Sequence, residues 1–186
     1  MDYDWFSERF PALADAYCLT LLRGLTPEGM FRELGVEPGA RIVGVDGLLE
    51  PSYDTWSERR FLVGAGQLEG WTLLVEYNGR LGITDEVMLP LSRGRVIVSH
   101  FLTADALDHF CWYADGVRRL HFEPLFPERR DGPEAERVGG WVREAGFVGE
   151  SRVGACFELA RRITGVRVTP DVFEEGVFLC GFVDVR

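Results

Sequence analysis

The chain has 186 residues, of which 46% are hydrophobic, and its formal net charge is −10 at pH 7. This length and apolar content predict a single folded domain, residues 1–186, and exclude both a disordered chain and a small disulfide scaffold. The acidic balance argues against nucleic acid as a partner, because a phosphate backbone requires clustered positive charge. All 20 basic residues are arginine, a bias typical of a GC-rich genome, and this excludes Schiff-base lysine chemistry and a P-loop lysine.

The cysteines and the N-terminus indicate a cytoplasmic protein. The cysteines lie in apolar stretches without metal-ligand spacing, which predicts buried free thiols in a reducing compartment. They are Cys18, Cys111, Cys156 and Cys180. The N-terminal residues are acidic, unlike those of a secretory signal, and the apolar runs are too short to span a bilayer. We therefore expect no membrane partner, and the negative charge would suit a basic protein partner.

Helical patterns dominate the first part of the chain. Residues 10–23 carry apolar side chains at the 3-4 spacing of one helix face, and Gly24 would end that helix. Thr26 is then the expected N-cap of a short helix that stops at Gly35. Residues 42–45 fit a short strand.

An aromatic-rich block predicts the centre of a sheet. Residues 71–77 fit a strand, Asn78-Gly79 fits a two-residue type I′ turn, and residues 80–84 would return as the second strand. Because the predicted strands carry apolar residues on both faces, we expect a sheet that is covered on both sides. Glu76 would lie among leucine and isoleucine side chains, so its carboxylate must find a partner or its pKa rises.

A second hairpin is expected around Asp115-Gly116, between residues 110–114 and 117–122, after a short helix from Thr84 and a strand over 95–99. Its register would pair Tyr113 with Arg118, Trp112 with Arg119, and Phe110 with His121. Tryptophan, tyrosine and arginine are the residues that most often anchor interfaces. The candidate partner-binding patch is therefore Trp112, Tyr113, Arg118 and Arg119 near this hairpin tip.

The last third of the chain predicts a solvated loop over 127–136, helices that begin near 138, 151 and 169, and a strand over 177–182. Helices and strands are mixed, and the strands pair by hairpins. This favours the α+β class, with an antiparallel sheet packed by N-terminal and C-terminal helices, over a doubly wound fold.

No motif establishes a chemistry. Residues 64–70 resemble a dinucleotide fingerprint, but the third glycine is one position late and a strand follows. The weak catalytic candidates are four ionisable residues of the sheet block, namely Glu76, His100, His121 and Glu123. If they met in one cleft they could perform acid–base work, whereas in separate places they would be core histidines and salt-bridged glutamates. A metal held by His100, His121 and Glu123 is the minor alternative, so we expect neither a metal nor a cofactor.

Several stretches together resemble an uncharacterised actinobacterial protein family of unknown function. They cover residues 16–28, 70–79, 99–101, 122–126 and 164–170, and the likeness extends over most of the chain. The resemblance implies a bacterial cytoplasmic protein and transfers no activity and no site.

The leading hypothesis is a non-enzymatic interaction module, immunity-like or regulatory. Its support is the negative charge, the aromatic and arginine residues at the hairpin tip, and the lack of a catalytic motif. The alternative is a small-ligand-binding protein or an unrecognised hydrolase with a pocket on the sheet. The sequence leaves open whether the protein is a monomer or a homodimer.

Overall fold

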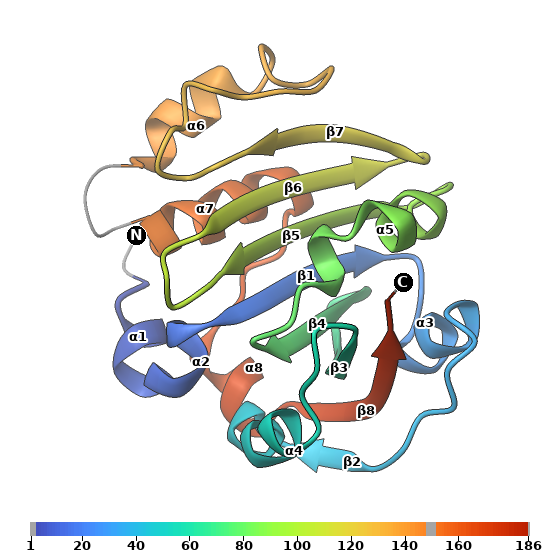
Figure 1. The fold of residues 1–186 in the computed structure, drawn as a ribbon. Coiled ribbons are helices and arrows are strands. Elements are labelled where there is room, and N and C mark those ends of the chain that lie inside the picture. The colour runs from blue at the N-terminus through green and yellow to red at the C-terminus, as the bar shows by residue number, and fades with distance from the viewer. Residues whose placement is uncertain (1–2, 148–151, 186) are drawn as a thin grey trace.

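An eight-stranded antiparallel sheet organises the residues that the structure describes, 3–147 and 152–185 of this computed structural model (Figure 1). The strand order is β2-β8-β3-β4-β1-β5-β6-β7. The strands are β1 (Tyr17–Arg23), β2 (Arg41–Val43), β3 (Arg60–Leu68), β4 (Trp71–Tyr77), β5 (Val96–Leu102), β6 (Asp108–Ala114), β7 (Val117–Phe122) and β8 (Val177–Asp184). The α+β class expected from the sequence is confirmed.

Helices cover both faces of this sheet. They are α1 (Trp5–Arg9), α2 (Pro11–Asp15), α3 (Pro27–Glu33), α4 (Leu49–Asp54), α5 (Asp85–Leu91), α6 (Gly139–Ala145), α7 (Arg152–Thr164) and α8 (Pro170–Glu175), with the 3-10 turns η1 (Val45–Leu48) and η2 (Leu81–Ile83). One face, called here the α7 face, packs against α1, α2, α6, α7 and α8. The opposite face, called here the α5 face, packs against α3, α5 and η2 (Figure 1). Among the described residues, no helix has the length and apolarity needed to cross a membrane.

The helix predicted over residues 10–23 is wrong beyond Asp15, because residues 17–23 form β1. This strand lies between β4 and β5, and residues 17–22 are all buried. A strand covered on both faces reads as a continuous apolar run, which satisfies helical spacing as well as strand alternation. The position of the strand in the middle of the sheet decides between the two.

The predicted first hairpin is also wrong in its second half. β4 forms as expected, but it pairs with β3 and β1 rather than with residues 80–84. The two-residue turn is Glu69-Gly70, with φ values of 46° and 81° that suit type I′ geometry. After β4, the chain turns away from the sheet into η2, because β1 already occupies the edge that residues 80–84 would need.

The second hairpin forms at Asp115-Gly116, and Tyr113 pairs with Arg118 as predicted. A β-bulge next to Trp112 makes Arg119 an extra residue, so Trp112 pairs with Leu120. The predicted pairs Trp112–Arg119 and Phe110–His121 are therefore wrong. His121 instead faces Cys111, one position from its expected partner.

Helix boundaries follow local chemistry closely. The Thr26 hydroxyl accepts a hydrogen bond from the Gly29 amide at 3.1 Å and caps α3, as expected from the sequence. The predicted C-terminal helices correspond to α6, α7 and α8, and the predicted last strand to β8.

We predict that Gly82→Ala destabilises the fold, whereas Gly140→Ala does not. A Cβ atom at Gly82 would lie 2.8 Å from Cys18 Sγ and 2.9 Å from Ser99 Oγ, and closer still to Thr20 Oγ1. The overpacking should lower the free energy of unfolding by about 1–3 kcal/mol. No atom lies within 4 Å of a Cβ placed at Gly140 in α6, so that variant should gain about 0.5–1 kcal/mol from helix propensity. Urea unfolding of both variants measures the difference, and equal stabilities would contradict it.

Candidate functional site

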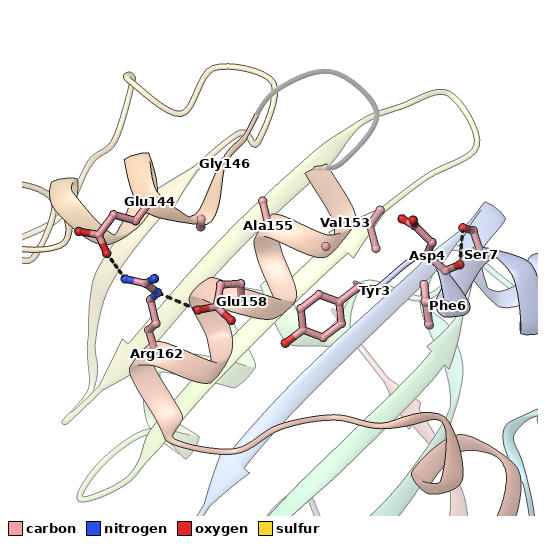
Figure 2. A pocket seen from close by; sticks show the side chains of 13 residues that line it. Tyr3, Asp4, Phe6, Ser7, Glu144, Gly146, Val153, Ala155, Glu158 and Arg162 are labelled. Atoms are coloured by element: carbon pink, nitrogen blue, oxygen red, sulfur yellow. Dashed lines mark hydrogen bonds and ion pairs between the residues drawn. The ribbon is translucent and has the colours of Figure 1, made fainter. Parts of the chain in front are cut away.

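A hollow of about 540 Å³ lies where α1 meets the end of α6 and the first turns of α7 (Figure 2). Its walls come from three segments that are far apart in the sequence. The lining residues are Tyr3, Asp4, Phe6, Ser7, Ala14, Glu144, Ala145, Gly146, Val153, Gly154, Ala155, Glu158 and Arg162. The volume falls in the range typical of small-ligand and side-chain pockets, roughly 300–1,000 Å³.

An ordered ion-pair chain forms one wall of the hollow. The Arg162 guanidinium donates to Glu158 at 2.9 Å and also to Glu144 (Figure 2). Arg161 donates two further hydrogen bonds to Glu158, at 2.8 and 2.9 Å. The i,i+3 and i,i+4 spacing on α7 brings these groups together. The arginine hydrogen bonds, of Arg161 first and then Arg162, lower the pKa of Glu158 to about 2. Glu158 therefore stays ionised at neutral pH.

The opposite wall combines apolar and acidic groups from the N-terminal segment. The Tyr3 ring packs on Phe157 with centroids 5.3 Å apart, and Phe6 is buried behind it. Asp4 lies beside Ser7, whose hydroxyl donates to the Asp4 carbonyl at 3.1 Å (Figure 2). The lining thus carries three carboxylates, from Asp4, Glu144 and Glu158, and one guanidinium, from Arg162. Arg161 beside it also pairs with Glu158, which leaves a surplus of one negative charge. This charge and shape suit a cationic group on an apolar stem.

The hollow holds no arrangement of the kind that activates a nucleophile. Its described lining residues include no histidine and no cysteine, and the Ser7 hydroxyl is engaged by a backbone carbonyl. Nucleophilic catalysis requires a base within hydrogen-bond reach of the nucleophile.

His100 lies elsewhere, inside a closed polar network under α7. Its Nδ1 atom lies 2.9 Å from the Tyr17 hydroxyl and its Nε2 atom 2.7 Å from Asp108 Oδ1. A neutral imidazole satisfies both contacts when Nε2–H donates to Asp108 and Nδ1 accepts from Tyr17. Burial and the Asp108 charge raise the pKa of the nearby Cys156 thiol, so the thiol stays protonated. Both imidazole nitrogens are occupied, which leaves none to activate Cys156.

Glu76 is buried on the α5 face, and the expectation about its environment is met in both respects. Its carboxylate accepts hydrogen bonds from the amides of Leu81 at 2.9 Å and Gly82 at 3.4 Å. Burial nevertheless outweighs these contacts and raises the pKa of Glu76 to about 7. The side chain therefore binds the first two amides of η2 and is fully buried.

The four weak catalytic candidates do not converge. Glu76 lies opposite Cys18, whereas His100 contacts the adjacent Tyr17, so the two groups lie on opposite faces of the sheet. His121 lies beside His109 near the β7 edge, and Glu123 is exposed after that strand. The single cleft that would have supported acid–base work is absent from the described part of the chain.

The predicted partner-binding residues do not form one exposed patch either. Tyr113 is fully buried and donates to Asp85 at 3.0 Å on the α5 face. Trp112 points to the α7 face, where the Arg137 guanidinium lies 5.5 Å from its ring centroid. Successive strand residues point to opposite faces, so the sequence cluster is divided by the sheet. Arg118 pairs with two carboxylates, and Arg119 with Asp115 at 3.4 Å.

The cysteines match the sequence prediction. All four are free and buried. Burial is the largest cause that raises the pKa of each thiol, which disfavours the reactive thiolate. Within residues 3–147 and 152–185, no three His, Cys, Asp or Glu side chains are grouped so as to hold a metal ion.

Comparison with known proteins places the chain in a family. It belongs to DUF6461, a family of unknown function whose match covers residues 1–186. No curated protein and no solved structure matches the chain. The resemblance to a family of unknown function is therefore confirmed, and the function of this DUF6461 chain has to be argued from its own geometry.

Sequence reasoning missed the hollow. The Glu158–Arg162 pair was the one visible signal, since its i,i+4 spacing can be read directly. Nothing in the sequence indicates that Tyr3 and Asp4 lie beside that pair, because the contact depends on how α1 and α7 pack on one face of the sheet.

We predict that Glu76 makes the protein less stable as the pH rises. The folded-state pKa of about 7 lies above the ordinary value of 4.5, so the folded protein binds the proton more tightly. Stability from this group is complete below pH 4.5 and is lost as the pH rises through 7, by about 3 kcal/mol in total. Glu76→Gln should flatten the decline between pH 5 and 8 in urea unfolding, whereas the exposed control Glu37→Gln should not. Parallel curves for wild type and Glu76→Gln would contradict this.

We predict that Tyr17→Phe lowers the free energy of unfolding by about 1–3 kcal/mol, because it leaves the buried Nδ1 of His100 without its hydrogen-bond donor. The control is Tyr53→Phe, which removes a hydroxyl from a side chain that is 50% exposed and should change stability little. Chemical denaturation measures both variants, and an equal effect would show that the buried hydrogen bond contributes nothing specific.

Proposed function

We propose that this DUF6461 chain is a non-enzymatic interaction module, immunity-like or regulatory, whose partner inserts a basic group into the hollow between α1, α6 and α7. The observation that carries the proposal is the charge of the hollow, where three carboxylates outnumber the paired guanidiniums of Arg161 and Arg162, in a chain of net charge −10. Complementary charge accelerates encounter and selects partners. An arginine or lysine side chain has both the cation for the acidic wall and the aliphatic stem for Tyr3 and Val153.

Support for a non-enzymatic role comes from where the reactive groups lie. His100 is closed between Tyr17 and Asp108, Glu76 is enclosed under η2, and all four thiols are buried. These groups serve the interior of the fold and do not face the hollow. The cavity beside His100 has a volume of only about 20 Å³, which is too small for a substrate.

A small-ligand-binding role is the second candidate, because the hollow is large enough for a free organic amine. It would use the same acidic wall and no catalytic residue. This candidate places the ligand in the hollow and not in a pocket on the sheet, because Glu76, His100, His121 and Glu123 do not meet in one cleft.

The cellular setting is part of the proposal. Twenty arginines without a lysine, four free buried thiols and an acidic surface suit the cytoplasm of a bacterium with a GC-rich genome, such as an actinobacterium. A monomer and a symmetric homodimer are both compatible with a partner at the hollow.

The test is affinity capture from the source cells with two charge-matched double variants. Asp4→Asn with Glu144→Gln removes two carboxylates from the hollow, and Glu37→Gln with Asp105→Asn removes two exposed carboxylates elsewhere. We expect a basic partner to bind wild type and the control, and to bind the hollow variant at least about tenfold more weakly, in calorimetry with the purified partner.

Two outcomes would count against the proposal. Equal binding of the partner to both double variants would move the interface away from the hollow. If no protein is captured and a free diamine binds wild type but not the hollow variant, the small-ligand alternative would replace the interaction module.

A further inference from the structure

Two of the three histidines of the chain meet on the α5 face, far from the hollow. His109 lies on β6 and His121 on β7, and the bulge beside Trp112 sets the register that makes them diagonal neighbours. His109 Nδ1 and His121 Nε2 are 3.1 Å apart, with ring centroids separated by 5.2 Å. Without the bulge, His121 would have paired with Phe110 and pointed to the opposite face.

The two rings are held in place from both sides. The Phe101 ring stacks on His109 with centroids 6.1 Å apart and an interplanar angle of 19°. Outside the edge strand β7, the segment around Asp131 pairs with His121, and the two residues exchange two backbone hydrogen bonds of 2.9 Å. The pair is preorganised by packing on one side and by backbone pairing on the other. The His121 side chain is still 26% exposed, so solvent reaches the site.

The Asp131 carboxylate lies next to the His121 nitrogen that does not face His109. Asp131 Oδ2 lies 3.9 Å from His121 Nδ1, the nitrogen that faces away from His109. A carboxylate at this position favours the tautomer with the proton on Nδ1, which leaves the Nε2 lone pair directed toward His109. Metal-binding histidines commonly have such a carboxylate behind them.

The nearest cation to the histidine pair is Arg118. Arg118 lies between Asp85 at 3.1 Å and Asp131 at 3.5 Å, so two carboxylates balance one guanidinium. Burial first, and then the Arg118 charge, lower the pKa of His121, which favours the neutral imidazole, the form that ligates a metal ion.

We propose that His109 and His121 bind one divalent transition-metal ion of the class that prefers imidazole, with Zn²⁺ as the representative ion. Two nitrogen ligands at about 2.0–2.1 Å from a tetrahedral Zn²⁺ lie roughly 3.3 Å apart, close to the 3.1 Å found here. The ion takes the place of the proton that His109 Nδ1 donates to His121 Nε2. That proton moves to His109 Nε2, so both ligand nitrogens present a lone pair to the ion. Because the described residues offer no third His, Cys, Asp or Glu ligand, water fills the other positions and the ion is exchangeable.

The first experiment is a Zn²⁺ titration by calorimetry of protein produced without a polyhistidine tag. Wild type should bind one ion per chain, and His109→Ala and His121→Ala should each weaken binding by about tenfold or more. Asp131→Asn should also weaken it about tenfold, whereas Asp115→Asn should not. Asp115 is the matched control because it too pairs with an arginine of the same hairpin.

The second experiment does not depend on a variant that folds. The chain has three histidines, and His100 is enclosed between Tyr17 and Asp108, so it serves as an internal reference in histidine NMR spectra of wild type. Added Zn²⁺ should shift the His109 and His121 resonances together and leave His100 unchanged. The proposal is overturned if wild type binds no Zn²⁺ at millimolar concentration, if both alanine variants bind as tightly as wild type, or if the two resonances do not move.

Discussion

The burial of β1 on both faces is the constraint on which the rest of the structure depends. This strand comes from the N-terminal part of the chain yet lies inside the sheet, hydrogen-bonded to β4 and β5. Leu19, Leu21 and Leu22 are each almost completely buried, and each contributes roughly 1.5–3 kcal/mol of apolar burial. Because side chains of β1 are buried on both faces of the sheet, both faces must be covered by helices.

β1 also sets the positions of the two interior polar networks. Because neighbouring strand residues point to opposite faces, Tyr17 reaches His100 on the α7 face while Cys18 and Thr20 lie under η2 on the α5 face. In the first network, the buried Asp108 carboxylate lies 2.7 Å from His100 Nε2 and 3.7 Å from Arg152 Nε, so an arginine balances its charge. His100 is satisfied as a neutral imidazole, and Glu76 binds a proton more readily than an exposed glutamate does. Such networks fix register and packing.

Groups available for recognition lie at the joints between elements instead. The acidic hollow lies where α1, α6 and α7 meet, and the His109–His121 pair lies near the β7 edge on the other face. Both are arranged by contacts that order charged side chains, through Arg162 in the hollow and Arg118 beside the histidines. The arginines, which make up all 20 of the Lys and Arg residues, thus act as fixed counter-charges, which their planar, multidentate guanidinium groups suit well.

By itself, the sequence determined the α+β class of the fold and most local structure: the Thr26 cap of α3, the Asp115-Gly116 hairpin, the C-terminal helices, and the buried state of Glu76 and the four cysteines. These follow from neighbouring residues, whose capping, turn and burial preferences act over a few positions.

Only the tertiary structure decided that residues 17–23 are a central strand, that Glu69-Gly70 rather than Asn78-Gly79 turns the first hairpin, and that a bulge shifts Trp112, Arg119 and His121 out of their expected pairs. It also decided that Tyr3 meets Glu158 and that His109 meets His121. The reason is that a doubly buried strand has no periodicity of its own, and strand order and the contacts between distant segments depend on which edges and faces the rest of the chain has already filled.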